Sequence, residues 1–198
     1  MAKKNGDKHE QILEAAAAVF AHKGYFGSRV ADIAAKARVA DGTIYLYFRS
    51  KEEILVALFD RAMHRFLDRA RAELAGLSGA DACLRRLARL HLEQLGGNRD
   101  LAIVFQVELR QSQKFMRRLS TTILAEYLDL IRAVIRQGLA EGSLRKDLPE
   151  KVVTKCFFGI LDEMATNWVL SRRKYRLEDM APVVADLFLC GLRAGSRP

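Results

Sequence analysis

Apolar residues recur every three or four positions along nearly the whole chain, which is the spacing of one helix face. The first such segment covers residues 8–22, and later ones cover 51–74, 81–95, 99–110, 113–140, 149–170 and 178–193. Short breaks such as Gly96-Gly97-Asn98 separate them. Only three prolines occur in 198 residues, fewer than many short turn-linked strands would require. The pattern predicts an all-α protein with about nine helices.

The composition indicates a globular chain with a polyanionic partner. Half of the residues are hydrophobic and 29% are charged, and the formal net charge is +9, with the basic excess densest in residues 1–51. No run approaches the roughly 18 to 20 apolar residues of a membrane span, so we expect no membrane partner. The start MAKKNGDKHE lacks the apolar run of a signal peptide. We therefore expect a cytoplasmic protein.

Cysteine and histidine spacing gives no indication of a metal site. The three cysteines, at positions 83, 156 and 190, are far apart and suit reduced thiols. The four histidines do not share a helix at i, i+4 spacing. We expect no metal and no cofactor.

Residues 28–51 have the spacing of a helix-turn-helix. Ser28 is expected to cap a short helix with an apolar face that includes Ile33 and Ala34, and a second helix follows a turn. Ser50 and Glu53 fit a capping box that begins a helix reaching Leu74. In such a motif Ile33, Ala34, Val39 and Ile44 form a small core, and exposed side chains enter the DNA major groove. An ordinary helical hairpin with solvated charges fits the spacing equally well.

Residues 15–55 also resemble the N-terminal domain of the TetR family. The matching stretches are Gly24-Tyr25, Val30-Ala31-Asp32-Ile33-Ala34, Gly42-Thr43-Ile44-Tyr45, Tyr47-Phe48 and Ser50-Lys51-Glu52. Two positions depart from the family pattern: Arg38 replaces its usual glycine, and Ala40 replaces a frequent serine.

The resemblance implies a homodimeric repressor that binds a palindromic operator in double-stranded DNA. Residues 1–50 would form a three-helix DNA-binding domain, and residues 51–198 a helical domain for a small-molecule effector and for dimerisation through the helices at 149–170 and 178–193. The expected DNA-binding residues are Ser28, Arg29, Arg38, Asp41, Gly42, Thr43, Tyr45, Tyr47 and Lys51.

A second informative segment carries basic residues at i, i+4, i+7 and i+8, namely Arg110, Lys114, Arg117 and Arg118. They share one face if the helix is continuous, and they form either a solvated basic face or a phosphate site. Nearby apolar residues can line a cavity. A phosphate-rich head with an apolar tail describes acyl-CoA.

Val107-Glu108-Leu109-Arg110-Gln111-Ser112 and Phe158-Gly159-Ile160-Leu161-Asp162-Glu163 resemble the fatty-acid-degradation (FadR-type) regulators of the TetR family. That resemblance implies release from DNA by long-chain acyl-CoA. The expected ligand-binding residues are Phe105, Leu109, Arg110, Lys114, Arg117, Arg118, Leu124, Tyr127, Phe157, Leu161 and Trp168.

Two other functions compete with this hypothesis. An enzyme acting on acyl-CoA would need a nucleophile motif, and none is present; Asp162 and Glu163 are adjacent and point about 100° apart on a helix, which does not suit paired acid–base carboxylates. We therefore expect no catalytic residues. An efflux regulator sensing lipophilic drugs would not need the basic segment.

Overall fold

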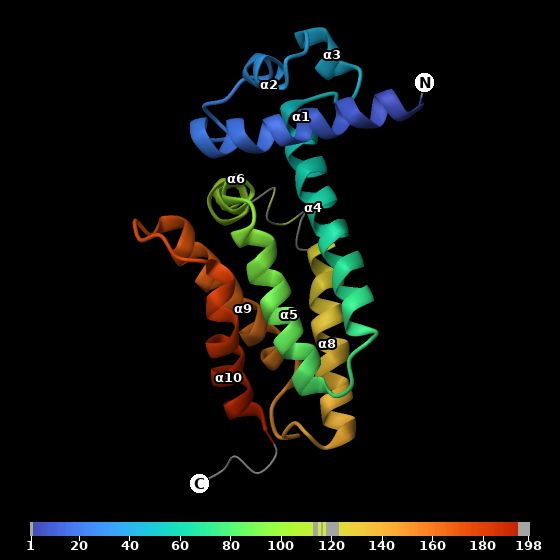
Figure 1. The fold of residues 1–198 in the computed structure, drawn as a ribbon, viewed down its shortest axis with the longest axis vertical. Helices are drawn as coiled ribbons and strands as arrows, with labels where there is room; N and C mark the ends of the chain where they lie inside the picture. The colour runs from blue at the N-terminus through green and yellow to red at the C-terminus, as the bar shows by residue number, and fades with distance from the viewer. Residues whose placement is uncertain (1, 113–114, 116, 118–122, 194–198) are drawn as a thin grey trace.

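The structure is a computed structural model that describes residues 2–112, 115, 117 and 123–193. Helices α1 (Ala2–Lys23), α2 (Val30–Ala37) and α3 (Asp41–Tyr45) form a head at the top of Figure 1. Helix α4 (Lys51–Leu74) runs down from the head along the body. The described residues thus begin with the predicted three-helix unit.

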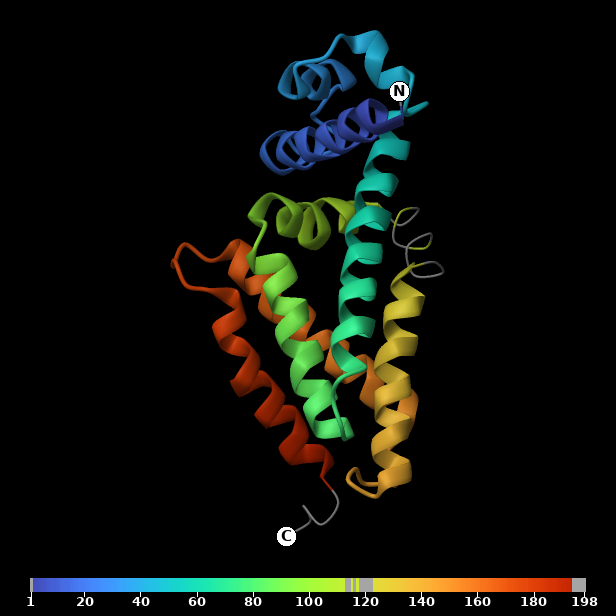
Figure 2. The same ribbon diagram turned by 45° about the vertical axis from the view of Figure 1, so that its right-hand side comes forward.

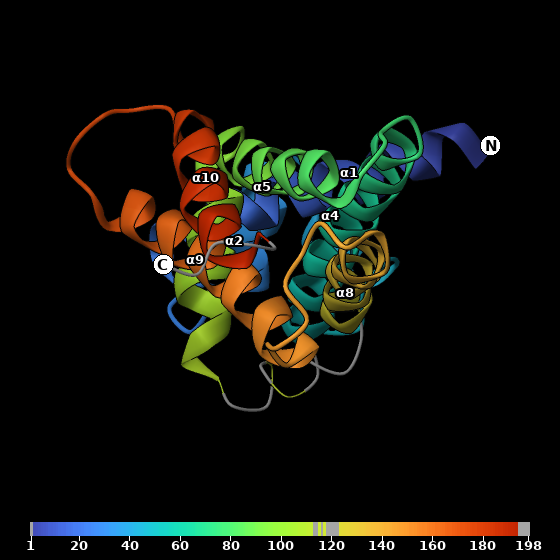
Figure 3. The same cartoon turned by 90° about the horizontal axis from the view of Figure 1, so that it is seen from below.

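The body contains α5 (Ala80–Gly96), α8 (Ile123–Glu141), α9 (Glu150–Leu170) and α10 (Ala181–Leu192). Viewed from below, α9 and α10 lie on one side, α4 and α8 on the other, and α5 lies between α10 and α4 (Figure 3). A short helix, η3 (Leu177–Met180), precedes α10. The described part of the chain holds nine α-helices and no strand, which confirms the all-α prediction.

Between head and body lies a segment of changing helical type, visible directly beneath α1 in Figure 2. It begins as α6 (Arg99–Ile103), widens to the π-helix η1 (Val104–Glu108) and ends as the 3₁₀ turn η2 (Leu109–Gln111). The sequence pattern had predicted one regular helix over 99–110. The period of apolar residues cannot distinguish these helical types over so few residues.

The helix starts in the head differ in detail from the predictions. The Ser50 hydroxyl accepts from the Glu53 amide at 3.1 Å, as a capping box requires, but the Glu53 carboxylate accepts from Arg49 N at 2.6 Å and not from Ser50. Helix α2 begins one residue later than predicted, with Arg29 as its N-cap residue. The Ser28 hydroxyl does not cap α2, because it donates to the Tyr25 carbonyl at 2.8 Å.

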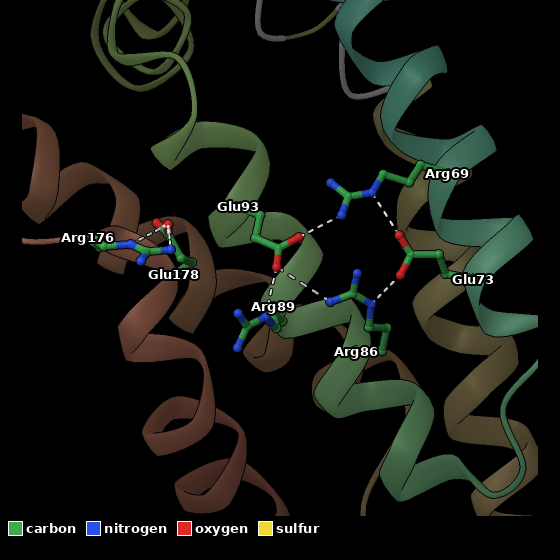
Figure 4. A network of polar contacts seen from close by, with 7 residues as sticks. All are labelled: Arg69, Glu73, Arg86, Arg89, Glu93, Arg176 and Glu178. Atoms are coloured by element: carbon green, nitrogen blue, oxygen red, sulfur yellow. Dashed lines mark hydrogen bonds and ion pairs between the residues drawn. The ribbon is translucent and has the colours of Figure 1, made fainter.

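Helix α4 is fastened to α5 by charged side chains (Figure 4). Arg69 and Arg86 both contact Glu73, and both also contact Glu93, which Arg89 joins. Single exposed ion pairs contribute little to stability, but here each carboxylate binds more than one guanidinium. The network fixes α5 against α4 within the body.

Arg38, the C-cap of α2, has a φ of 54°, and it is the only non-glycine residue with positive φ in the described part of the chain. The left-handed region disfavours side chains with a Cβ atom. The resemblance had already marked this position as one where glycine is usual. The backbone conformation explains why.

We expect Arg38→Gly to stabilise the free protein by about 1 kcal/mol, because glycine adopts this conformation without strain. The midpoint of thermal unfolding should rise by about 2–4 °C. If the Arg38 side chain binds a DNA phosphate, the same variant should lower the salt dependence of operator binding by about one counterion. A lower melting temperature of the variant would show that the backbone conformation of Arg38 does not cost stability.

Candidate functional site

The head presents α3 on its outer surface, and Ile44 anchors that helix. Ile44 is fully buried with Ile33 and Ala34, and Val39 packs against them, as the sequence predicted. Tyr45 is 57% exposed and Leu46 is 82% exposed. Sequence reasoning missed Leu46, which is apolar and therefore reads as a core position. Two large exposed apolar side chains beside each other favour a contact surface.

The other predicted DNA-binding residues differ in exposure. Arg29, Arg38, Asp41 and Gly42 are exposed, Thr43, Tyr47 and Lys51 are half-buried, and Ser28 is buried. The Lys51 ammonium donates to the carbonyls of Tyr25 and Ser28, both at 2.6 Å, and lies 4.6 Å from the Tyr25 ring centroid. Burial lowers the pKa of Lys51. In this structure Lys51 and Ser28 hold the turn between α1 and α2 against the start of α4.

A cavity of about 220 Å³ lies inside the body, far larger than the roughly 10–15 Å³ that a single water needs by the same measure. Its lining comes from α4, α5, η1, η2, α8 and α9 and is mostly apolar and aromatic. The lining residues are Phe59, Met63, Phe66, His91, Gln94, Leu95, Phe105, Gln106, Leu109, Arg110, Leu124, Tyr127, Phe158 and Asp162. Such walls suit an apolar ligand.

The lining contains some of the predicted ligand residues and not others. Phe105, Leu109, Arg110, Leu124 and Tyr127 line the cavity. The lining does not include Phe157, Leu161 or Trp168, which are buried elsewhere. The Phe157 ring packs on Phe188 of α10 with centroids 5.0 Å apart, and the Trp168 indole donates to the Tyr175 carbonyl at 2.9 Å.

The lining also contains residues that the sequence did not predict. Most of them belong to α4 and α5, and two, Phe158 and Asp162, belong to α9. Phe158 follows Phe157 directly, and a step of one residue turns a side chain by about 100° around the helix. The apolar period gave both helices a buried face. It could not say which part of that face borders a cavity.

The predicted basic stripe is not one helix face. The helical run that carries Arg110 ends at Gln111, and Ser112 is extended, with φ −123° and ψ 115°. Residues before and after Ser112 therefore belong to separate segments. Arg117 is exposed, and Lys114 and Arg118 lie outside the described residues.

Arg110 forms the polar end of the cavity together with Asp162. The Arg110 guanidinium donates to the Asp162 carboxylate at 2.5 Å and to the Gln106 side-chain oxygen at 2.8 Å. Thr166 of α9 also donates to that Gln106 oxygen, at 2.9 Å. The Arg110 guanidinium is thus held at the cavity wall by two acceptors, and an anionic ligand that enters the cavity would compete with them for it.

His91 and Tyr127 form a second polar pair in the lining. A hydrogen bond of 3.0 Å joins His91 Nδ1 to the Tyr127 hydroxyl, while His91 Nε2 has no partner among the residues that the structure describes. Burial lowers the pKa of His91 to about 4, and the Asp162 charge opposes that shift. Burial also raises the pKa of Tyr127. Both groups are therefore neutral at pH 7.

Helices α9 and α10 carry exposed apolar side chains that do not line the cavity. They are Val152, Ile160 and Leu170 of α9 and Val183 and Leu187 of α10. Within the described ranges, no cluster of three or more His, Cys, Asp or Glu side chains is arranged to hold a metal ion. The helices of that same part of the chain include none with the length and apolar character needed to cross a membrane.

A helix-turn-helix head joined to a helical body with an apolar cavity defines a ligand-controlled regulator of bacterial type. Residues 12–58 match the family model described as bacterial regulatory proteins of the tetR family, and residues 59–191 match the model described as the C-terminal region of YsiA-like proteins. The chain belongs to the TetR family.

Several of the proteins similar to this chain carry names from fatty-acid metabolism. The fatty acid metabolism regulator protein of Bacillus subtilis is 37% identical over 190 residues, which cover 96% of this chain and 98% of the relative. The fatty acid degradation regulator FadR from Bacillus halodurans superposes with a TM-score of 0.89 at 40% identity, covering 94% of this chain and 96% of that one.

FadR from Bacillus subtilis, solved in complex with stearoyl-CoA, gives a TM-score of 0.87 at 37% identity over 92% of this chain and 98% of its own. These relatives are transcriptional regulators and not enzymes. The comparisons thereby exclude the sequence-based alternative of an acyl-CoA-processing enzyme.

Proposed function

We propose that this protein represses genes of fatty-acid degradation and is released from its operator by long-chain acyl-CoA. The observation that carries the proposal is the cavity, in which aromatic and aliphatic walls lead to the Arg110 guanidinium. An acyl chain fits the aromatic and aliphatic walls, and a phosphate or thioester group fits the guanidinium. The stearoyl-CoA complex of the similar Bacillus subtilis regulator supports this ligand class.

The acyl chain would lie among Phe59, Phe66, Phe105 and Phe158, where each buried methylene is stabilised by about 0.8 kcal/mol. The charged CoA head would remain near the surface, where Arg110 is partly exposed. Lys114, Arg117 and Arg118 remain candidates for further phosphate contacts. Acyl-CoA would act as the effector, and the proposal includes no cofactor.

DNA binding would reside in residues 1–50, with residues 51–198 binding the ligand and forming the dimer. Thr43, Tyr45 and Leu46 are the candidates for base and sugar contacts, and Arg29, Arg38 and Arg49 for phosphates. The exposed apolar side chains of α9 and α10 would pair with the same helices of a second copy, because two such faces bury each other in a two-fold dimer. The dimer would place two α3 helices on a palindromic operator in the cytoplasm.

The test is release of the dimer from operator DNA by acyl-CoA esters of increasing chain length. Each added pair of methylenes should lower the half-maximal concentration by about tenfold or more until the cavity is full, because 0.8 kcal/mol per methylene corresponds to about fourfold. Free fatty acids of the same lengths are the control and should act at higher concentration, because they lack the CoA phosphates. Equal potency of acid and ester would favour a general sensor of lipophilic molecules.

A further inference from the structure

The segment formed by η1 and η2 contacts both the cavity and the head. Phe105, Gln106, Leu109 and Arg110 line the cavity. Glu108, between them in sequence, is only 7% exposed and contacts the turn after α1. A change in the position of this segment therefore reaches both sites.

The contact of Glu108 with the head is short and specific. The Tyr25 backbone amide donates to Glu108 Oε2 at 2.6 Å, and Gln111 Nε2 donates to the other carboxylate oxygen at 3.4 Å. Gly24 has a φ of 73°, and a Cβ atom there would lie 3.5 Å from Oε2. The carboxylate is thus packed directly against the Gly24-Tyr25 turn.

Tyr25 connects that turn to the rest of the head. Its carbonyl accepts from the Ser28 hydroxyl and from the Lys51 ammonium. Its ring packs edge-on against Phe115, with centroids 5.2 Å apart. Displacing Tyr25 would disturb both the entry to α2 and the start of α4.

The segment also has a physical means of adopting two arrangements. In η1 the Leu109 amide donates to the Val104 carbonyl, five residues back, whereas an α-helix bonds four residues back. Conversion of this turn to α geometry changes the register by one residue and rotates the following side chains by about 100°. Phe105, Leu109 and Glu108 cannot all keep their contacts during that change.

We propose that Glu108 is the positioning residue that couples occupancy of the cavity to the orientation of the DNA-binding head. A ligand that displaces Phe105 and Leu109 shifts the π-helical segment, and the Glu108 carboxylate then releases the Tyr25 amide. The head loses one of its anchors to the body, and the spacing of the two α3 helices in the dimer changes. This inference rests on the proposed function for the identity of the ligand, but not for the contact itself.

The first test measures coupling, defined as the ratio of operator dissociation constants with and without saturating stearoyl-CoA. Glu108→Ala should reduce this ratio by about tenfold, while Glu108→Gln, whose amide oxygen can still accept from Tyr25 N, should retain most of it. The matched control is Glu141→Ala, because Glu141 also accepts a backbone amide, that of Ala80 at 3.2 Å, at the far end of the body. An unchanged ratio in Glu108→Ala, or an equal loss in Glu141→Ala, would overturn the proposal.

The second test does not depend on the natural ligand. Hydrogen exchange of the Tyr25 amide is followed in the wild type, with stearoyl-CoA added, and in Leu95→Phe, which fills part of the cavity from α5. Both stearoyl-CoA and the Leu95→Phe substitution should accelerate exchange of the Tyr25 amide at least threefold. In Glu108→Ala this exchange should already be fast, and neither change should accelerate it further. If neither changes exchange in the wild type, cavity occupancy does not reach this contact and the proposal is wrong.

The two tests separate the two proposals. If stearoyl-CoA does not release the wild-type protein from DNA, the proposed ligand is wrong. The response of Tyr25 exchange to Leu95→Phe then decides the role of Glu108.

Discussion

Replacing Arg110 by alanine is expected to raise the acyl-CoA concentration needed for operator release by about tenfold or more, whereas Asp162→Asn is expected to lower it. The Arg110 guanidinium is bound to the Asp162 carboxylate at 2.5 Å in the free protein. A CoA phosphate must compete with that carboxylate. Without Arg110 the ligand meets an uncompensated negative charge, and without the Asp162 charge the guanidinium is available from the start.

Operator release by stearoyl-CoA, measured by fluorescence anisotropy, checks this pair of variants. Arg136→Ala is the control, because it removes the same charge from a surface arginine that pairs with Glu150 and does not line the cavity. Operator affinity without ligand should be the same in all three variants. Effects of Arg110→Ala and Asp162→Asn in the same direction would mean that the ligand does not compete with Asp162 for Arg110.

Acid is expected to destabilise the protein through His91 by about 3 kcal/mol between pH 6.5 and pH 4. Burial lowers the folded-state pKa of His91 from 6.5 to about 4. The unfolded chain therefore takes up a proton below pH 6.5 that the folded protein does not, and stability falls with each unit of pH until the folded-state pKa is reached. Above pH 6.5 both states are neutral at this residue, so it causes no pH dependence there.

His91→Gln tests this expectation, because glutamine can still pair with Tyr127 but does not titrate. Between pH 7 and pH 4 the free energy of unfolding, measured in urea, should fall for both proteins. The fall should be about 3 kcal/mol smaller for the variant than for the wild type. Exposed His64, replaced by glutamine, is the control and should leave the pH profile unchanged. Parallel profiles of wild type and His91→Gln would show that other groups cause the acid sensitivity.

The fold of this protein was predictable because its determinants are local. The apolar period fixes a helix within one or two turns, and glycine at Gly24 or a cap at Ser50 marks its end or its start. The same local signals located the core of the head around Ile33 and Ile44. Where the helical type changed, at the π-helix η1, no local signal distinguished hydrogen bonds that reach five residues back from those that reach four.

The candidate ligand site was predictable only in part. Arg110, Phe105 and Tyr127 were predicted as ligand residues because the sequence places basic residues close to apolar and aromatic ones in this segment, and all three line the cavity. Phe59 and Phe66 on α4 did not, because their spacing is that of ordinary core residues. Whether a buried aromatic fills a core or borders a cavity depends on the helices that face it.

The sequence by itself therefore determined most of the helices, and its resemblance to a known family identified the helix-turn-helix, since both depend on residues close together along the chain. The tertiary structure alone decided that Asp162 meets Arg110, that His91 meets Tyr127 and that Glu108 contacts Tyr25. These partners are separated by 52, 36 and 83 residues. Contacts between such distant residues are set by how whole helices pack, and the pattern within any one helix does not contain that information.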